Sequence, residues 1–275
     1  MNKKIHIICV LYNDVISNIK SLENFYKMQD KYGVRNIKIH IYDNSKDVFV
    51  LKNRSLMKSE QEMQDRIHYM ENGGNIGLTK TYNKAIREVQ NADEWLMFAD
   101  DDTFFSEEYL DHAIGYINSN DCKEQIVTGL IHAADRILGP TRTDTWKLNN
   151  HPLESVGVYD NIYCINSGLF INRAIYDMIG LYDEEMFLDM VDFYLMENLR
   201  QHGLNHIRVV DGLIEQTFSG DQNVYNEGVA IRFQIFQKDF KLYCKFAKKS
   251  WMYQQIILKR RALRIWLMKH MGKAK

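Results

Sequence analysis

Three consecutive carboxylates, Asp100, Asp101 and Asp102, follow the apolar run "EWLMFA". Adjacent like charges repel each other, so the chain holds this cluster at a cost unless a cation neutralises it. Carboxylate oxygens are preferred ligands of Mg²⁺ and Mn²⁺, and an ion held by one or two of them completes its shell with water and substrate phosphates. The cluster therefore indicates a divalent-metal site that receives a phosphate-bearing ligand.

A solvated acidic turn is the alternative, since the aspartates precede the helical pattern "SEEYLDHAI" and Thr103 could cap that helix. The surrounding elements favour the metal site. Strand patterns at 4–12, 37–43, 66–71 and 94–100 alternate with helical patterns near 15–30 and 78–90. This alternation predicts an α/β fold with a mostly parallel sheet. Each strand pattern ends in polar residues, which should converge on one site because ligands bind beyond the carboxyl ends of parallel strands.

The segment "ENGGNIGLTKTYNKAI" (71–86) joins a predicted strand to a predicted helix and contains Gly73, Gly74 and Gly77. It matches neither the dinucleotide fingerprint nor the P-loop. By itself it is compatible with a phosphate-binding loop or with a tight turn.

The N-terminus and the cysteines indicate a cytoplasmic protein. The four cysteines, Cys9, Cys122, Cys164 and Cys244, are far apart and match no metal-ligand spacing, which predicts reduced thiols. The first residues, "MNKKIHIICVLYND", are typical of a strand and contain no signal-peptide cleavage site. No window approaches the roughly 18 apolar residues that a bilayer span needs.

The formal net charge of −1 conceals two regions of opposite sign. Residues 238–275 contain twelve lysines and arginines against the single acid Asp239, so this tail carries +11 and the body −12. Its interleaved basic and apolar residues predict an amphipathic helix on an anionic membrane, here the inner face of the plasma membrane. Alternatively, the apolar side chains pack on the body or on a second subunit of a homodimer. These are Leu242, Phe246, Trp251, Ile257, Leu263 and Trp266. No nucleic-acid motif accompanies the charge, so nucleic acid is not an expected partner.

Five blocks in order carry a resemblance to a known family. They are "VLYND" (10–14), "YDNS" (42–45), "NGGNIGLTKTYNKAI" (72–86), "FADDDTFF" (98–105) and "NSGLFINRAIYDMIGLYDEEMFLDMVDFYLMENLRQHG" (166–203). The sequence resembles the inverting family-two glycosyltransferases with the GT-A fold, particularly bacterial rhamnosyltransferase-like members that build surface polysaccharides such as capsule. The resemblance implies a catalytic domain at 1–220, with a nucleotide-binding half at about 1–105 and an acceptor-binding half at about 106–220. A basic helical extension at 221–275 follows.

The resemblance also implies a donor site for a nucleotide-diphosphate sugar, dTDP-rhamnose or a UDP-hexose, with Mn²⁺ or Mg²⁺ as cofactor. Asp43, with backbone around Leu11 and Tyr12, would bind the base or ribose, and Asn75 and Gly77 would lie near the nucleotide. Asp100 and Asp102 form the family's Asp-x-Asp motif, with Asp100 towards ribose and metal and Asp102 as the main metal ligand. Asp101, the residue between them, is counted with the nucleotide-sugar site, but its side chain is expected to point away from the metal.

Inverting transfer to a glycan or lipid-linked acceptor also needs a base that removes the proton of the acceptor hydroxyl. Asp189 and Asp192 are three residues apart, which places them on one face of a predicted helix beside Phe187 and Phe193. Apolar surroundings raise the pKa of a carboxyl group and make it a better base. We predict Asp189 as the base, with Asp192 shaping the acceptor pocket or exchanging roles with it. First-turn helix acids favoured by the helix dipole are the alternative.

Two departures from the family pattern concern the metal and the acceptor. A histidine that often completes the metal site is absent, and "DGLIEQTFSGDQN" (211–223) offers Glu215 or Gln216 instead. Tyr194 stands where the helix usually carries a second acid. Two other functions therefore stay open: a sugar nucleotidyltransferase, and a nucleotide-binding membrane adaptor without catalysis. The former would be expected to show a glycine-rich N-terminal loop with a basic residue near position 10, which "CVLYND" lacks.

Overall fold

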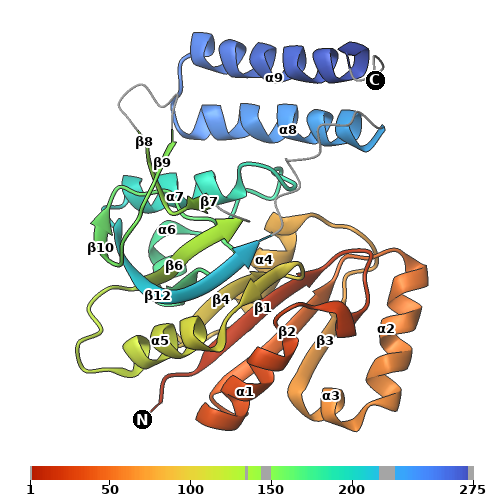
Figure 1. The fold of residues 1–275 in the computed structure, drawn as a ribbon, viewed down its shortest axis with the longest axis vertical. Helices are drawn as coiled ribbons and strands as arrows, with labels where there is room; N and C mark the ends of the chain where they lie inside the picture. The colour runs from red at the N-terminus through yellow and green to blue at the C-terminus, as the bar shows by residue number, and fades with distance from the viewer. Residues whose placement is uncertain (1, 134–135, 144–149, 217–226, 272–275) are drawn as a thin grey trace.

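The computed structural model describes residues 2–133, 136–143, 150–216 and 227–271 (Figure 1). Its first half alternates strands and helices as predicted. The elements are β1 (Ile5–Leu11), η1 (Ile16–Asn18), α1 (Leu22–Tyr32), β2 (Ile37–Asp43), α2 (Asp47–Ser59), α3 (Gln61–Arg66), β3 (Ile67–Glu71), α4 (Leu78–Glu88) and β4 (Trp95–Asp100). The helix expected near 15–30 is split into the short 3-10 turn η1 and α1.

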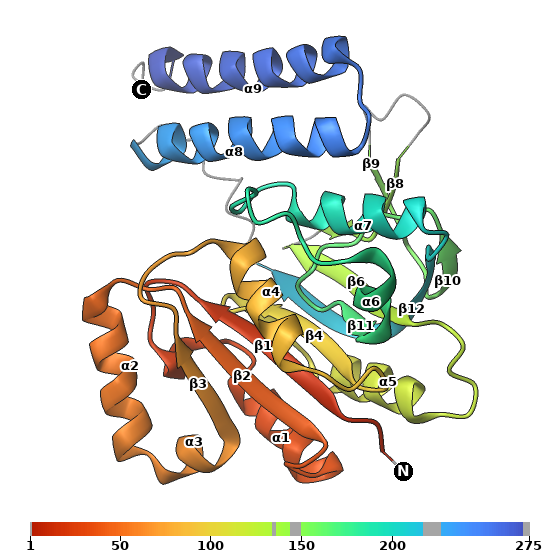
Figure 2. The same ribbon diagram turned by 180° about the vertical axis from the view of Figure 1, so that it is seen from behind.

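The first four strands form a parallel sheet in the order β3-β2-β1-β4. Alternate side chains of β1 face opposite sides of the sheet, because successive residues of a strand point in opposite directions. Ile7 and Cys9 belong to one hydrophobic cluster with α1 and α5, whereas Ile8 and Val10 belong to a second cluster with α4. A sheet with apolar side chains on both faces must be covered by helices on both faces, and Figure 2 shows this layering.

The second half extends this sheet with strands of mixed direction. It contains β5 (Thr103–Phe105), α5 (Glu107–Asn118), β6 (Ile126–Ala133), β7 (Arg136–Gly139), β8 (Thr141–Thr143), β9 (Asn150–Pro152), β10 (Gly157–Asp160), β11 (Phe170–Asn172), α6 (Ala174–Ile179), α7 (Val191–Gln201) and β12 (His206–Gln216). The sheet continues beyond β4 through β11, β6, β12 and β10, and β11 runs antiparallel to both of its neighbours. The predicted α/β class is confirmed, with the uninterrupted parallel part confined to the first half.

Two long helices, α8 (Glu227–Phe246) and α9 (Trp251–Met271), form the end of the described chain and confirm the predicted helical extension. They lie one above the other beyond α7, with α9 outermost (Figures 1 and 2). Phe236, Phe240 and Tyr243 of α8 join the same hydrophobic cluster as α7. The predicted boundary at 220/221 lies outside the described residues.

Candidate functional site

The carboxyl ends of the first strands meet at one edge of the sheet, as predicted. Asp43 pairs in register with Leu11, and Asp100 pairs with Val10. The backbone N–H of Tyr12 donates a hydrogen bond to Asp101 Oδ2 at 3.1 Å. The Tyr12 side chain is half exposed, whereas Leu11 is buried. The sheet edge therefore brings the first, second and fourth strand ends together.

Asp43 is fully buried and its carboxylate already has internal partners. Oδ1 accepts a hydrogen bond from the backbone of Ser45 at 2.8 Å, and Oδ2 accepts from Asn53 at 2.8 Å and Tyr69 at 2.7 Å. These bonds fix the loop after β2 to α2 and β3. The predicted contact between Asp43 and a nucleotide stays a prediction.

The three aspartates at the end of β4 all have raised pKa values. Burial, followed by the charges of Asp192, Asp102 and Asp101, raises the pKa of Asp100 to about 7. Burial is also the main cause that raises the pKa of Asp101 to about 6, and it raises the pKa of the more exposed Asp102. β5 separates these residues from α5, whose N-terminus is capped instead by Ser106. The cluster is therefore no helix-capping turn.

Two polar side chains hold Asp100 in place from distant parts of the chain. Ser167 Oγ accepts the backbone N–H of Asp100 at 3.0 Å, and Gln216 Nε2 donates to Asp100 Oδ2 at 3.0 Å. Glu215 is exposed, and side chains alternate along a strand, so it faces away from Gln216. Of the two residues predicted to replace the missing histidine, Gln216 is the one that reaches the acidic cluster.

This cluster fits a divalent cation. The negative charge of Asp102 raises the pKa values of Asp100 and Asp101, whereas Lys20 opposes the rise at Asp102 itself. A bound cation removes the repulsion between the carboxylates. The oxygen atoms of Asp100, Asp102 and the Gln216 amide are hard ligands of the type that Mg²⁺ and Mn²⁺ prefer.

The glycine loop before α4 packs directly against the segment that carries Asp189. Asn75 Oδ1 accepts the N–H of Gly77 at 3.0 Å, and Leu78 N–H donates to the carbonyl of Phe187 at 2.7 Å. Gly77 has φ +88°, and a Cβ atom there would lie 2.7 Å from the Phe187 ring. Only glycine fits both the backbone conformation and the space. The predicted donor and acceptor segments are thus in contact.

Asp189 and Asp192 do not share a helix face, so that prediction is wrong. Met190 adopts a left-handed conformation with φ 63°, and α7 begins only at Val191, which leaves Asp189 in the preceding loop. Asp239 of α8 causes this arrangement: its fully buried carboxylate accepts the backbone N–H groups of residues 187, 188 and 189 at 2.8–3.0 Å. These bonds stabilise the turn outside the helix.

The two acids also differ in their partners. Asp189 Oδ1 pairs with Arg232 of α8 at 3.1 Å, while its buried Oδ2 has no hydrogen-bond partner among the described residues. Asp192 Oδ1 accepts the backbone N–H of Asn166 at 3.1 Å, and burial raises its pKa to about 6. The negative charge of Asp192 in turn raises the pKa of Asp100, so Asp192 lies near the acidic cluster.

The helical extension therefore contributes to the candidate site, which the sequence reasoning missed. Arg232 contacts Asp189, and Asp239 holds the loop that presents it. One signal was present in the sequence: Asp239 is the single acid of a strongly basic segment, and an isolated acid there suggests a specific buried partner. Ser167 was also missed and carried no comparable signal, whereas Gln216 was one of the two residues predicted in place of the histidine.

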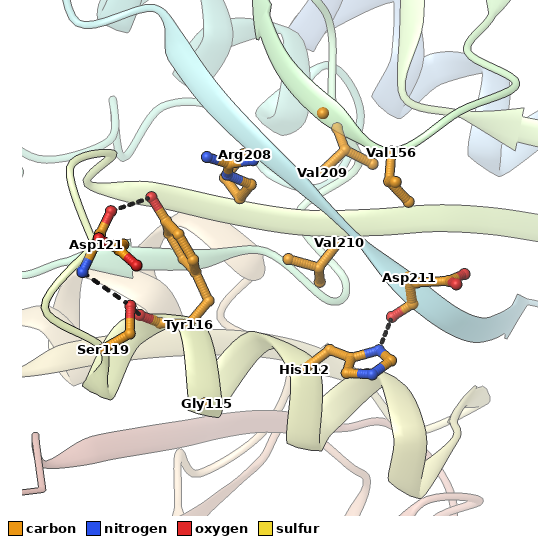
Figure 3. A pocket seen from close by; sticks show the side chains of 11 residues that line it. His112, Gly115, Tyr116, Ser119, Asp121, Val156, Arg208, Val209, Val210 and Asp211 are labelled. Atoms are coloured by element: carbon orange, nitrogen blue, oxygen red, sulfur yellow. Dashed lines mark hydrogen bonds between the residues drawn. The ribbon is translucent and has the colours of Figure 1, made fainter.

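A separate hollow of about 610 Å³ lies between α5 and β12 (Figure 3). His112 and Asp211 are joined there by a hydrogen bond from ring nitrogen to backbone oxygen at 3.1 Å, and the Arg208 guanidinium lies over the Tyr116 ring. None of the candidate site residues lines it. The hollow is therefore separate from the candidate site.

Residues 7–179 match the family model described as glycosyl transferase family 2. Over 210 residues the chain is 24% identical to "dTDP-rhamnosyl transferase RfbF" of Shigella flexneri. The alignment covers 70% of this chain and 62% of that protein. The chain thus spans less than two thirds of this curated relative.

Solved structures confirm the GT-A fold. The chain superposes on GalNAc-T7 bound to UDP, GalNAc and Mn²⁺ with a TM-score of 0.65 and 14% identity, covering 97% of this chain and 56% of that one. A mannosyltransferase of Pyrobaculum calidifontis in complex with GDP-Man and Mn²⁺ matches with a TM-score of 0.59 and 13% identity, covering 100% and 76%. S. aureus TarS (residues 1–349) with UDP-GlcNAc matches with a TM-score of 0.57 and 15% identity, covering 95% and 72%.

Proposed function

The chain belongs to glycosyl transferase family 2, and from this premise we propose that it is a metal-dependent inverting glycosyltransferase. It moves a sugar from a nucleotide-diphosphate donor to a hydroxyl group of a glycan or lipid-linked acceptor during bacterial surface-polysaccharide synthesis in the cytoplasm. The observation that carries this proposal is the set of mutually repelling carboxylates around Asp100 at the carboxyl edge of the parallel strands.

Asp102 and Asp100 hold Mn²⁺ or Mg²⁺, with Gln216 beside them. The cation supplies positive charge that stabilises the diphosphate leaving group as the glycosidic bond breaks. Gln216 and Ser167 support this role because they hold the side chain and backbone of Asp100 in one orientation. Asp101 orients the loop after β1 through its bond from Tyr12.

The nucleotide lies along the loops after β1, β2 and β3. Backbone groups around Leu11 and Tyr12, the Asp43 carboxylate, and Asn75 and Gly77 form its contacts. A direct bond from Asp43 to the base or ribose requires that Asp43 release one of its internal partners, and crystals grown with the donor would reveal that change.

Asp189 acts as the base that takes the proton of the acceptor hydroxyl while that oxygen attacks the anomeric carbon opposite the departing diphosphate. Its Oδ2, which has no hydrogen-bond partner in the described part of the chain, supports this role, and Arg232 and Asp239 fix its position. Asp192, nearer to the acidic cluster, shapes the acceptor pocket.

The donor is dTDP-rhamnose or a UDP-hexose; the curated relative named a dTDP-rhamnosyl transferase favours the former. The test is incubation of the chain and Mn²⁺ with these donors. Release of nucleoside diphosphate supports the transferase. Pyrophosphate exchange would instead indicate a nucleotidyltransferase. If no donor is turned over, the chain is a nucleotide-binding adaptor.

The outer helix α9 docks on an anionic membrane. Within the described residues no helix is long and apolar enough to cross a bilayer. The exposed apolar residues of α9 are Trp251, Met252, Ile256, Leu263, Trp266 and Leu267. All but Trp251 share one helical face, opposite Arg261, which packs over the Phe236 ring of α8 at 3.8 Å. α9 contains no acid. Of the six apolar tail residues for which packing on the body was the alternative, Leu242, Phe246 and Ile257 do pack against the core.

Vesicle sedimentation tests this docking. The chain should bind phosphatidylglycerol vesicles and bind phosphatidylcholine vesicles weakly, because each basic residue near an anionic surface contributes about 1 kcal/mol. The double variant Leu263→Ser/Trp266→Ser should lose binding, whereas Leu51→Ser, at an equally exposed leucine on α2, should keep it. If the double variant instead turns a dimer into a monomer and leaves vesicle binding unchanged, the face is a homodimer interface.

A further inference from the structure

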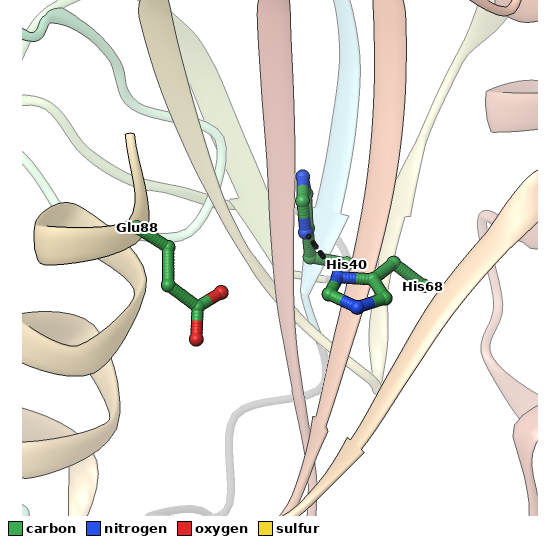
Figure 4. Close-up of side chains that lie close together, drawn as sticks. All are labelled: His40, His68 and Glu88. Carbon is green, nitrogen blue, oxygen red and sulfur yellow. Dashed lines mark hydrogen bonds between the residues drawn. The ribbon is translucent and has the colours of Figure 1, made fainter. Parts of the chain in front are cut away.

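Three histidines lie on neighbouring strands, on the face of the sheet that α4 covers. His40 of β2 pairs in register with His68 of β3, and His6 of β1 stacks on His40 with ring centroids 5.0 Å apart. Figure 4 shows the rings of His40 and His68 beside the Glu88 side chain of α4. One nitrogen of His40, one nitrogen of His68 and one Glu88 oxygen all lie within 4.8 Å of one another.

Hydrogen bonding fixes the tautomer of His40. Glu94 Oε2 lies 2.8 Å from His6 Nε2, and a carboxylate only accepts, so His6 Nε2 carries the proton. In the neutral form of this ring, with the proton on Nε2, the other nitrogen Nδ1 is an acceptor. His40 Nε2, 2.9 Å from that Nδ1, must therefore be the donor. A neutral His40 then has an unprotonated Nδ1.

That nitrogen can accept a hydrogen bond from His68, whose proton a bound metal ion would displace. His40 Nδ1 and His68 Nδ1 are 3.2 Å apart. Two nitrogen ligands at about 2.0–2.1 Å from a tetrahedral zinc ion are separated by about 3.3 Å. The two rings thus already have the separation that a shared metal ion requires. Glu88 is held in turn by Tyr42, whose hydroxyl donates to Oε2 at 2.7 Å.

We propose that His40, His68 and Glu88 bind a transition-metal ion, with Zn²⁺ as its representative, at a site separate from the acidic cluster. Two imidazoles and one carboxylate form a ligand set that suits Zn²⁺ rather than Mg²⁺ or Mn²⁺, and water completes the tetrahedron. The relay from Glu94 through His6 to His40, and the bond from Tyr42 to Glu88, are the outer contacts that orient metal ligands in such sites.

This zinc site lies apart from the proposed catalytic site, and its ion would have a structural role. His40 precedes Asp43 by three residues on β2, which separates them by about 10 Å along the strand. The ion would join α4 to β2 and β3, and α4 begins at the glycine loop of the donor site. Lys4 and Lys38 act on His40 with their positive charge, which opposes cation binding, and Lys84 lies over the Tyr42 ring. We therefore expect moderate affinity.

Calorimetric titration of the metal-stripped full chain with ZnCl₂ tests the proposal. An Asp102→Asn background weakens binding at the acidic cluster. We expect one Zn²⁺ per chain with a Kd of about 1 μM, equivalent to about −8 kcal/mol. His68→Gln and Glu88→Gln should each weaken binding at least about tenfold. Both side chains are exposed, so these variants should fold. His112→Gln, at a histidine on the other face of the sheet, is the matched control.

Thermal unfolding provides a second measurement, because an ion that binds only the folded state raises Tm. Zn²⁺ should raise the Tm of the background chain and of the His112→Gln control, and should raise it much less in His68→Gln. Cobalt substitution should give the strong visible absorption of tetrahedral Co²⁺. Absence of zinc binding, or equal zinc affinity in His68→Gln, Glu88→Gln and the control, overturns the proposal and leaves the catalytic proposal untouched.

Discussion

Replacing Asp100 with asparagine should stabilise the metal-free protein. Asparagine has nearly the same shape, and its side-chain oxygen can still accept the bond from Gln216. It cannot carry the negative charge that Asp192, Asp102 and Asp101 oppose. The substitution therefore removes an electrostatic cost that the parent chain bears, which we propose serves metal binding.

The size of the effect follows from the pKa of Asp100, which rises from 3.8 to about 7 on folding. The unfolded chain loses this proton at lower pH than the folded chain. The free energy of unfolding of the parent therefore falls as pH rises from about 4 to about 7, and it keeps this lower value above pH 7. Three pKa units correspond to about 4 kcal/mol as an upper limit, because the neighbouring acids share the titration. We expect Asp100→Asn to gain about 2–4 kcal/mol near pH 8 and about 1 kcal/mol near pH 5.

Urea unfolding in EDTA at both pH values measures these gains. Asp93→Asn, at an exposed aspartate just before β4, is the control and should change stability little at either pH. Added Mn²⁺ should stabilise the parent and so reduce or reverse the advantage of Asp100→Asn. If the advantage of Asp100→Asn is equal at the two pH values, the account of repelling carboxylates is refuted.

Three further substitutions test the site. Asp189→Asn should leave donor affinity intact and reduce turnover by about 10²–10⁴-fold in steady-state assays; if Asp192→Asn does this instead, the base is Asp192. Asp239→Asn should cost about 2–4 kcal/mol in urea unfolding, because a buried charged acceptor of three backbone N–H groups is lost; an unchanged midpoint contradicts its anchoring role. Gly77→Ala should cost about 1–3 kcal/mol and weaken donor binding, whereas Gly115→Ala, with open space around its Cβ, should not; equal effects refute the crowding argument.

The sequence predicted the first half of the fold well because local signals there agree with the tertiary structure. β1, β2 and β4 are apolar runs that end in polar residues, and each lies within one or two residues of its predicted bounds. The convergence of Asp43 and Asp100 followed from parallel topology alone. The five blocks also predicted the family correctly.

Features that depend on long-range contacts were not predictable. Asp189 lies in a sequence that reads as helix, yet three bonds to Asp239, fifty residues away, keep it outside α7. The family pattern left Glu215 and Gln216 open, and only the three-dimensional structure shows that Gln216 reaches Asp100, more than a hundred residues away. His40 and His68 show no metal-binding spacing in the sequence, because strand register rather than chain proximity brings them together.

Calorimetry of nucleoside diphosphate binding tests whether the acidic cluster binds a cation together with the diphosphate. We predict that the parent binds dTDP or UDP in Mn²⁺ and at least about tenfold more weakly in EDTA, a difference of about 1.4 kcal/mol or more, and that Asp102→Asn loses this dependence. Equal affinity of the parent with and without the cation, or a full Mn²⁺ dependence in Asp102→Asn, would contradict it.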